Sequence, residues 1–566
     1  MRRFIVQCKR EVILFLIANF LAAAIGVTLA FILQFITDTA MTGSFQRVPM
    51  IIVMMIAYLV GDTFFDFAVG HTGVLLRTKI SMLFRNALVR RIQKSSIEEK
   101  EEKGDAYYLS LLNNNISEVE TEYVNGILII VFQIFSLIFA LAATTSIEPI
   151  LTVVIILMSV IPLIVPQLLK NKLEKVNRVA LEAKSKYLKI LNELLEGFQV
   201  LKIFGRERNF DQYHDVENEN YTRETRYNFK WRRFSMSLSY GMGNLVILGT
   251  WGIGLVFTLN GMIEFSQLIA LTTLMNMVAG PFQIISERYS NIIAGKAIAA
   301  DLLRYIDEDE REIRKYKSQE KDIEGIKFEN IMVRKDDRLI LDNVDFEIEK
   351  NQKICIIGGS GSGKSTLLKA IAGTISIQKG HIYLNGKELN GEAIITHPDS
   401  LFIEQNTTIF STSIANNITM FKPDSAERIE DTIDRSGLKE WFQRNGADVK
   451  KEIEKSKINL SGGEQKRLDF ARALMKEHAQ LLLFDEPTSG LDSYHAKNIM
   501  NQICGMNDIS IVVATHDLTR ENMMKFDRIY VIDNGKVALS GKPEEIIQSS
   551  IYKRLKQGES QDVYAT

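Results

Sequence analysis

The feature that most limits the fold of this chain is a long apolar stretch near its beginning. The residues from Val12 to Thr37 include no charged side chain. A helix needs about 20 apolar residues to cross the hydrocarbon core of a bilayer, so this stretch is long enough to span a membrane. The apolar core of a signal peptide is shorter, about 7–15 residues, and we therefore expect no cleavage here.

Five further stretches have a similar composition, which predicts six membrane-spanning helices. Pro162, Pro166 and Pro281 fall within these stretches and predict bends or breaks in the helices. The predicted spans lie at about 12–37, 48–76, 126–147, 149–169, 234–259 and 265–286.

The distribution of lysine and arginine predicts the orientation of the spans. The three short connectors contain a single basic residue, Arg47; they lie at 38–47, 145–148 and 260–264. The two long connectors, at about 77–125 and 170–233, contain 8 and 15 basic residues. Because basic loops remain on the cytoplasmic side of a membrane, we expect both long loops and both chain termini in the cytoplasm.

The second predicted span is the only one with acidic residues. Asp62 and Asp66 are four residues apart and therefore share one face of a helix. An ionisable group in mid-membrane costs on the order of 3 kcal/mol, so such groups usually face a polar interior. The pair predicts one of three things: the wall of a substrate cavity that favours cationic or hydrogen-bonding molecules, a structural contact with a neighbouring helix, or a span that ends before these residues. The sequence leaves all three open.

A charged segment divides the chain into two domains of unlike composition. Residues 307–322 are almost wholly charged or polar, which predicts a membrane domain at 1–322 and a second domain at 323–566. Alternating apolar residues at 325–333 and 338–350 predict antiparallel strands in the second domain. The net charge of −1 argues against a nucleic-acid partner, which favours a basic surface.

A glycine-rich motif in the second domain predicts a phosphate-binding loop. The sequence "GGSGSGKST" follows a short apolar run and precedes helical sequence, as the G-x-x-x-x-G-K-S pattern requires. Glycines let backbone N–H groups surround phosphates, Lys364 reaches the β- and γ-phosphates, and the Ser365 hydroxyl can ligate Mg²⁺. We therefore predict ATP and Mg²⁺ as cofactors, bound by Gly358, Gly359, Ser360, Gly361, Ser362, Gly363, Lys364, Ser365 and Thr366.

Two further apolar runs end in residues that suit phosphate chemistry. "AQLLLFDEPTSG" delivers Asp485 to the end of a predicted strand, where a carboxylate can hold the magnesium ion. Glu486 follows and is placed to orient or deprotonate an attacking water. In "ISIVVATHD", His516 comes just after a third apolar run. Phosphate chemistry in such sheets occurs at the carboxyl ends of strands.

The order of these motifs closely resembles that of the ATP-binding cassette (ABC) family, and six spans before one cassette look like an exporter-type half-transporter. By position, Gln405 is similar to the family's Q-loop glutamine, which contacts the metal ion and the γ-phosphate. His516 is similar by position to the family's switch histidine. The family's signature and D-loop match Leu460, Ser461, Gly462, Gly463, Glu464, Ser489, Leu491 and Asp492. The fold class implied is a polytopic helical membrane domain followed by an α/β P-loop NTPase domain of the ABC type.

The resemblance implies that the chain works with a partner. In this family two cassettes hold two ATP molecules head to tail, so the signature serves nucleotide bound by another half-transporter, a second copy or a homologous chain. The implied function is ATP-driven export of an amphipathic small molecule, lipid or peptide by alternating access, with Glu486, His516 and Gln405 as catalytic residues. The alternatives are import by the same architecture, or a regulatory subunit with little hydrolysis. The short loops also suggest a bacterial plasma membrane, whose lipids the spans contact.

Two stretches depart from the family's pattern. Val333 to Lys335 stand where an aromatic residue that stacks on adenine is expected. Either Arg334 or Lys335 covers the ring, or the nucleotide binds less tightly or with less selectivity for its base. Stacking is worth roughly 0.5–1.5 kcal/mol, so its loss would not abolish binding. The segment before the signature, residues 450–460, lacks the glycines expected of an exporter's inter-domain contact loop.

Overall fold

The computed structural model forms two compact units, each of which is described by itself. It describes residues 1–95, 97–307, 322–335, 338–389, 399–453 and 460–562, so most of the predicted linker lies outside the described residues. Met1–Gln93 and Asp105–Asp309 form the membrane unit, and Lys94–Gly104 and Glu310–Thr566 form the cassette unit.

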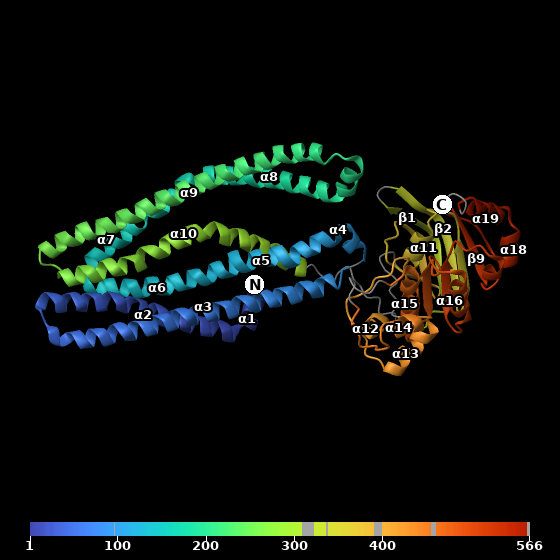
Figure 1. Ribbon diagram of the computed structural model, residues 1–566, viewed down its shortest axis with the longest axis horizontal. Coiled ribbons are helices and arrows are strands. Elements are labelled where there is room, and N and C mark those ends of the chain that lie inside the picture. Colours follow the sequence, from blue (N-terminus) through green and yellow to red (C-terminus); the bar gives the residue numbers. More distant parts are fainter. Residues whose placement is uncertain (96, 308–321, 336–337, 390–398, 454–459, 563–566) are drawn as a thin grey trace. The chain divides into compact units, whose positions relative to one another are not determined.

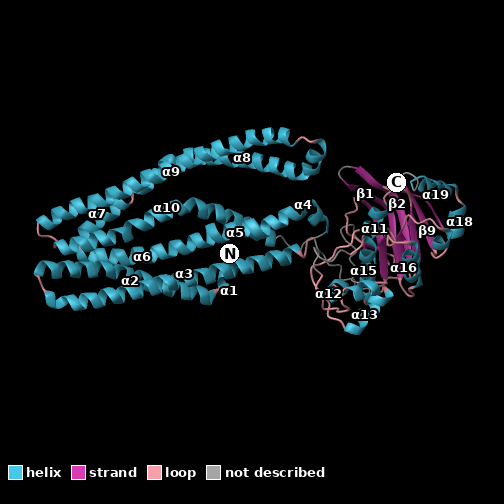
Figure 2. Ribbon diagram, viewed as in Figure 1, coloured by secondary structure: helices cyan, strands magenta, loops and turns pink. Residues whose placement is uncertain are grey.

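The membrane unit consists of long helices joined by short connections (Figures 1 and 2). Several are far longer than the about 20 residues that a bilayer core requires, so they extend beyond the membrane. Their bounds are α1 (Arg2–Gln7), α2 (Lys9–Thr42), α3 (Val48–Ile92), α6 (Asn125–Ile147), α7 (Pro149–Ser159), α8 (Ile161–Phe204), α9 (Glu207–Leu259) and α10 (Phe265–Asp307).

Within the described residues, five helical segments are long and apolar enough to cross a membrane. They are Lys9–Thr42, Phe45–Ile92, Ile97–Ile147, Glu207–Leu259 and Phe265–Phe282. The span predicted at 149–169 is instead divided between α7, which has 11 residues, and the start of α8. The division at Val160 has a clear cause, because Pro162 has no N–H group with which to continue the helical hydrogen bonds of α7.

The helix α4 (Ile97–Ser110) is interrupted where the two units meet along the chain. Gly104 has φ 72° and ψ 161°, a backbone conformation that only glycine adopts readily. Before it, Glu98 is hydrogen-bonded to Ser376, and Glu101 Oε1 lies 3.6 Å from Lys369 Nζ. The first part of α4 therefore packs on the cassette. After Gly104, the chain reaches α6 through α5 (Ile116–Glu118) and two π-helical segments, Leu111–Asn115 and Val119–Val124.

The cassette unit contains two β-sheets. The smaller has the strand order β2-β1-β4-β5, and the larger has the order β10-β9-β3-β8-β7-β6. The predicted antiparallel pairing of β1 with β2 is confirmed. The strands are β1 (Gly325–Lys335), β2 (Arg338–Glu349), β3 (Lys353–Ile357), β4 (Lys379–Leu384), β5 (Lys387–Leu389), β6 (Ser400–Ile403), β7 (Leu481–Asp485), β8 (Ser510–Ala514), β9 (Arg528–Asp533) and β10 (Lys536–Gly541).

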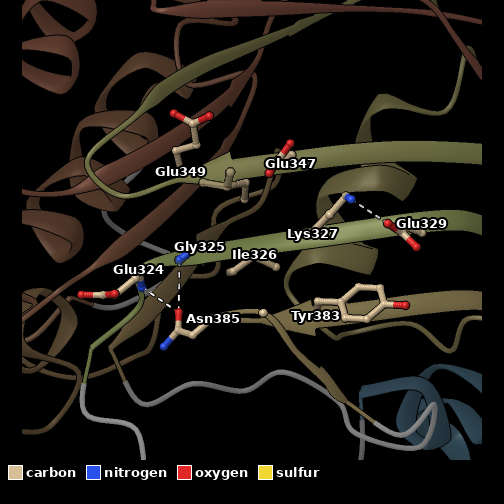
Figure 3. A pocket seen from close by; sticks show the side chains of 11 residues that line it. Glu324, Gly325, Ile326, Lys327, Glu329, Glu347, Glu349, Tyr383 and Asn385 are labelled. Carbon is tan, nitrogen blue, oxygen red and sulfur yellow. Dashed lines mark hydrogen bonds and ion pairs between the residues drawn. The ribbon is translucent and has the colours of Figure 1, made fainter.

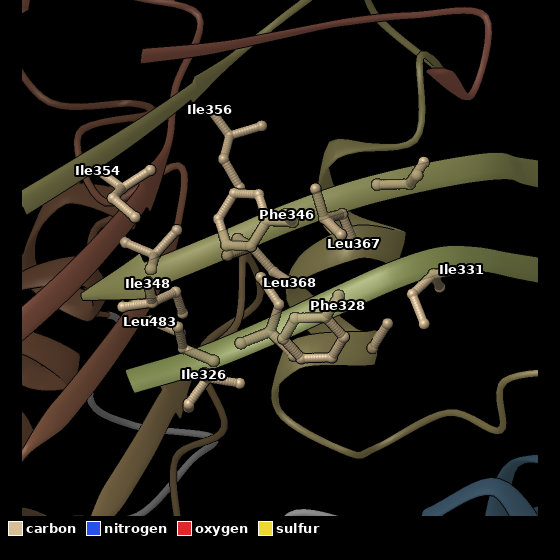
Figure 4. Packing of buried hydrophobic residues seen from close by; sticks show 14 of the residues in the cluster. Ile326, Phe328, Ile331, Phe346, Ile348, Ile354, Ile356, Leu367, Leu368 and Leu483 are labelled. Carbon is tan, nitrogen blue, oxygen red and sulfur yellow. The ribbon is translucent and has the colours of Figure 1, made fainter. Parts of the chain in front are cut away.

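The larger sheet is buried on both faces by apolar residues. On one face, Phe328 and Phe346 of the smaller sheet pack with Ile356 of β3 and Leu368 of α11 (Figure 4). The opposite face is covered by α15 to α19, with Met500 of α16 completely buried. The cassette helices are α11 (Lys364–Ile371), α12 (Ile414–Thr419), α13 (Ala426–Arg435), α14 (Lys439–Arg444), α15 (Gly462–Met475), α16 (Ser493–Gly505), α17 (Arg520–Met523), α18 (Pro543–Gln548) and α19 (Ser550–Asp562).

Five neighbouring strands of the larger sheet, β9-β3-β8-β7-β6, run parallel and end at the same edge. In their register, Ile356 of β3 and Asp485 of β7 both pair with Ala514 of β8, while Ile403 of β6 pairs with Phe484 of β7. The residues that follow these strands therefore emerge side by side. This alignment places the candidate site.

Candidate active site

The phosphate-binding loop connects β3 with α11. The loop's tip at Gly359–Gly361 is exposed, whereas Gly358, Ser362 and Gly363 are buried at its two ends. Because the loop leads directly into the N-terminus of α11, its backbone N–H groups and those of the first helical turn form a site for anions.

Glycine is required at two positions of this loop. A Cβ atom on Gly358 would lie 2.3 Å from the carbonyl oxygen of Ile532, closer than any side chain permits. Gly363 has φ +107°, and its Cβ would lie 2.9 Å from Leu341. Larger residues would therefore push the loop away from the strands that support it.

The ammonium group of Lys364 is buried beneath the loop. Its Nζ donates to the carbonyl oxygens of Gly358 and Gly359, both at 2.9 Å, and lies 3.2 Å from His516 Nε2. Charged phosphate oxygens would be stronger acceptors than these neutral carbonyls. The lysine is thus held where it can exchange its loop contacts for the phosphates of ATP.

Three predicted catalytic residues meet at the sheet edge. Gln405, two residues after β6, donates from Nε2 to Glu486 Oε2 at 2.7 Å. His516 Nε2 lies 2.9 Å from Glu486 Oε1. Glu486 itself has φ +51°, which is unusual for a residue with a side chain and turns its carboxylate toward both neighbours.

His516 can serve only one of its two neighbours at a time. Its Nε2 can donate a proton to Glu486 or accept one from Lys364, but a single nitrogen cannot do both. Burial, together with the positive charge of Lys364, lowers the pKa of His516, which favours the neutral ring. The histidine therefore lies within hydrogen-bond distance of both Lys364 and Glu486 and can bond either one.

The Asp485 carboxylate fits the Mg²⁺ ion that the motifs imply. Asp485 is 4% exposed, and its Oδ1 has no hydrogen-bond partner among the described residues. Burial raises the pKa of Asp485, an effect that a hydrogen bond from Ser365 partly offsets. A hydroxyl and a carboxylate side by side, with one carboxylate oxygen unused, are the oxygen ligands that Mg²⁺ prefers.

The signature residues form the beginning of α15. Ser461 is the N-cap and accepts from the Glu464 backbone N–H, while the Glu464 carboxylate accepts from the Ser461 N–H. This reciprocal pair is a capping box. The Glu464 side chain, 8% exposed, also forms an ion pair with Arg444. Glu464 is thus engaged within its own chain, whereas Ser461 and Gly462 are exposed.

Asp492 of the D-loop has a similar local role. It caps α16, accepting from the backbone N–H groups of Tyr494 and His495 at 3.1 and 3.0 Å. These two donors and the His495 side chain lower the pKa of Asp492. Its side chain is 61% exposed, so it remains accessible at the surface of the cassette.

Sequence reasoning missed a group of charged residues behind the glutamine. Lys466, Asp469 and Arg472 on α15 bind the segment from Gln405 to Thr408. Their spacing of three residues on a predicted helix was the available signal. The sequence did not indicate which loop this helix face would contact.

The remaining predicted residues lie elsewhere. Asp62 and Asp66 are on α3 in the membrane unit, Asp62 half-buried and Asp66 exposed. At the expected adenine position Val333 is buried in the core while Arg334 is exposed, so Val333 is not a stacking surface. Most of the glycine-poor segment before the signature, at 454–459, lies outside the described residues.

The outer face of the smaller sheet carries a separate pocket of about 600 Å³ (Figure 3). Its lining includes Glu324, Glu329, Glu347 and Glu349, and its one lysine, Lys327, is paired with Glu329 at 2.6 Å. Four carboxylates repel a triphosphate, so this pocket is unsuited to ATP.

The chain matches two family models in sequence order. The model described as "ABC transporter transmembrane region" matches residues 12–282, and the model described as "ABC transporter" matches residues 341–489. The second match runs from β2 through the phosphate-binding loop and the signature to Ser489.

Individual proteins are similar over most of the chain. An ATP-dependent lipid A-core flippase of Pseudomonas fluorescens (strain Pf0-1) is 26% identical over 530 residues, which cover 90% of this chain and 85% of the relative. ABC transporter B family member 24, mitochondrial, of Arabidopsis thaliana is 26% identical over 377 residues, which cover 63% of this chain and 53% of the relative. A solved structure of a bacterial Atm1-family ABC exporter with ATP bound superposes with a TM-score of 0.79 at 18% identity, covering 98% of this chain and 99% of that chain. With both family models matched along one polypeptide, the chain belongs to the ABC transporter family and combines its transmembrane region and its ATP-binding domain.

Proposed function

We propose that this chain is one half of an exporter that uses ATP to move a lipid or another amphipathic molecule across a membrane. As an ABC transporter, it couples ATP hydrolysis to substrate movement. The observation that carries the proposal is the meeting of Gln405, Glu486 and His516 at one sheet edge, in a chain whose other unit has membrane-spanning helices.

In the proposed site, the phosphate-binding loop and Lys364 hold the phosphates of ATP. Ser365, Asp485 and the Gln405 side chain would hold Mg²⁺, which when bound neutralises part of the phosphate charge. Glu486 orients and deprotonates the attacking water. His516 stabilises Glu486 by a hydrogen bond and contacts the γ-phosphate.

A partner chain completes the site in this proposal. The N-terminus of α15, with exposed Ser461 and Gly462, offers backbone donors to the γ-phosphate of ATP held by the partner. ATP binding draws the two cassettes together, and hydrolysis separates them. The first part of α4, which contacts Ser376 and Lys369, passes this motion toward the spans. Substrate is moved because its affinity differs between the two states.

Two observations support a lipid-like substrate in a membrane setting. Relatives from several Pseudomonas species bear the name lipid A-core flippase. On α3, large apolar side chains including Leu59, Val60, Phe64 and Phe67 are more than 60% exposed, which suits lipid or an apolar partner surface. We place both long loops, both termini and the cassette on the cytoplasmic side of a plasma membrane, from the distribution of basic residues.

The proposal is tested with the full chain in proteoliposomes that contain a fluorophore-labelled phospholipid. We expect ATP to change the fraction of lipid that an external quencher reaches, and Glu486→Gln to remove this change together with hydrolysis. Glu486-dependent hydrolysis without lipid movement would contradict a lipid substrate. A wild-type chain that binds ATP but does not hydrolyse it would instead support the regulatory alternative.

A further inference from the structure

The helix that begins with the signature also holds the loop that carries Gln405. Lys466 donates to the backbone carbonyl of Gln405, and Asp469 accepts from the Thr407 hydroxyl. Arg472 donates to the carbonyl of Thr408 at 2.7 Å. Residues three apart on a helix share one face, so this face of α15 binds the loop at three successive points.

These charged side chains are unusually buried. Lys466 is 9% exposed and Asp469 is 7% exposed. Arg472 also binds Asp469 at 2.9 Å, so this acid has its own cation besides the hydroxyl of Thr407. Burying a charge costs free energy that an apolar side chain would not incur, so stability alone does not account for a lysine at this position.

The contact made by Lys466 leads directly to the catalytic group. Gln405 is exposed to solvent, and its backbone is bound by Lys466 while its side chain binds Glu486 at 2.7 Å. The ammonium of Lys466 is also attracted by the nearby carboxylates of Asp485 and Glu486. A shift of α15 would therefore move Gln405 relative to Glu486.

We infer that Lys466 is a positioning residue for ATP hydrolysis, which fixes Gln405 against Glu486 according to the position of the signature helix. The inference rests on the proposed roles of Gln405 and Glu486. In this arrangement α15 carries the signature at its first turn and the contact to the hydrolytic loop at its second. Engagement of the signature by a partner's nucleotide would thereby be sensed at the chain's own catalytic glutamate.

The test compares variants of the full chain in lipid nanodiscs by steady-state ATP hydrolysis. Lys466→Met keeps the length of the side chain but removes the donor, and we expect kcat to fall about 10- to 100-fold with KM changed less than about twofold. Lys466→Arg keeps a donor and should recover most of kcat. The matched control is Arg467→Met, which removes one positive charge from the adjacent position, where the side chain packs near Gly437 instead of the loop.

A double-mutant cycle of Lys466→Met and Gln405→Ala distinguishes a positioning role of Lys466 from a general structural role. If Lys466 acts through Gln405, then Lys466→Met should lower kcat no further once Gln405 has been replaced. The melting temperature should fall only slightly, because the Gln405 carbonyl loses one donor while Asp469 keeps Arg472 as its cation. Additive effects in the cycle, or wild-type kcat in Lys466→Met, would overturn the inference.

A control distinguishes failure of this inference from failure of the proposed function. Hydrolysis that survives Glu486→Gln would refute the assignment of Glu486 itself. Hydrolysis that Glu486→Gln abolishes and Lys466→Met leaves intact would refute only the role of Lys466.

Discussion

Two acidic pairs stand out in this chain, and their surroundings differ sharply. Asp485 ends the buried strand β7 and Glu486 follows it, and the side chains of Ser365, Gln405 and His516 bind them. Asp62 and Asp66 lie on one long helix, Asp66 is exposed, and Asp62 interacts with Tyr58 one turn away on the same helix. Within the described residues, groups from several separate segments of the chain hold the first pair, whereas Tyr58, which contacts the second pair, belongs to the same helix.

This difference shows what makes an acidic pair part of a site. At the sheet edge, parallel register brings together residues from four strands, so each carboxylate receives partners distant in sequence. On α3, the four-residue spacing fixes only that the two acids share a face. A shared face whose described partner, Tyr58, comes from the same helix predicts no particular chemistry within one chain.

The largest expected effect is on the first pair. Replacing Glu486 by Gln removes the base and keeps the size and shape of the side chain, but it leaves one acceptor oxygen where the carboxylate offers one each to Gln405 and His516. We expect hydrolysis to fall by about 10²- to 10⁴-fold, with ATP binding retained. Hydrolysis and binding of a fluorescent ATP analogue would be measured on the same preparation. A loss smaller than about tenfold would mean that another group activates the water.

A second prediction concerns the missing aromatic residue. Lys335, the last residue of β1, is one of the three residues from Val333 to Lys335 that stand where the family's stacking residue is expected. Lys335→Tyr should add stacking on adenine worth roughly 0.5–1.5 kcal/mol, which lowers KM for ATP about two- to tenfold. Lys335→Ala serves as the control for loss of the lysine alone. An unchanged KM in the tyrosine variant would show that the adenine ring lies elsewhere.

A third prediction extends the comparison to Glu464, a buried acid whose main cation is Arg444. Arg444→Ala would leave the negative charge beside the signature uncompensated, repelling the triphosphate that the signature binds. Because Arg444 is 68% exposed, we expect only about a two- to fivefold loss of hydrolysis. Adding Glu464→Gln should restore activity. Equal activity of Arg444→Ala with and without Glu464→Gln would exclude the electrostatic explanation.

The smallest effect is expected at the second acidic pair. Asp62→Asn and Asp66→Asn should each leave basal hydrolysis within about twofold of the wild type, since both residues belong to the membrane unit and not to the unit that carries the ATP site. The same nanodisc assay measures this, with substrate-stimulated hydrolysis as a second readout. A loss of hydrolysis comparable with that of Glu486→Gln would contradict this difference between the two pairs. It would mean that Asp62 and Asp66 take part in coupling ATP hydrolysis to transport.

The parts of the site that the sequence predicted are those with a local signal. The phosphate-binding loop, Asp485 and His516 each follow a short apolar run, and such runs form buried parallel strands. The break before Pro162 also follows from proline chemistry. At these positions the local residue types are enough to predict where a strand or helix ends.

The parts that could not be predicted depend on tertiary packing. Lys466 and Asp469 contact a loop about 60 residues earlier in the chain, and helical spacing says nothing about which segment will lie opposite. The burial of the Glu464 side chain likewise involves an ion pair with Arg444, which lies on another helix, α14. The π-helical segments between Leu111 and Val124 had no distinguishing sequence pattern.

The central claim is that the signature of one chain serves the nucleotide of another. The most direct measurement is the mass of this chain expressed alone in lipid nanodiscs, corrected for lipid and scaffold protein, together with its ATP hydrolysis and with Glu486→Gln as control. We predict a particle of two chains whose hydrolysis depends on Glu486. A particle of one chain with full Glu486-dependent hydrolysis would contradict the claim, because its signature would have no partner's nucleotide to serve.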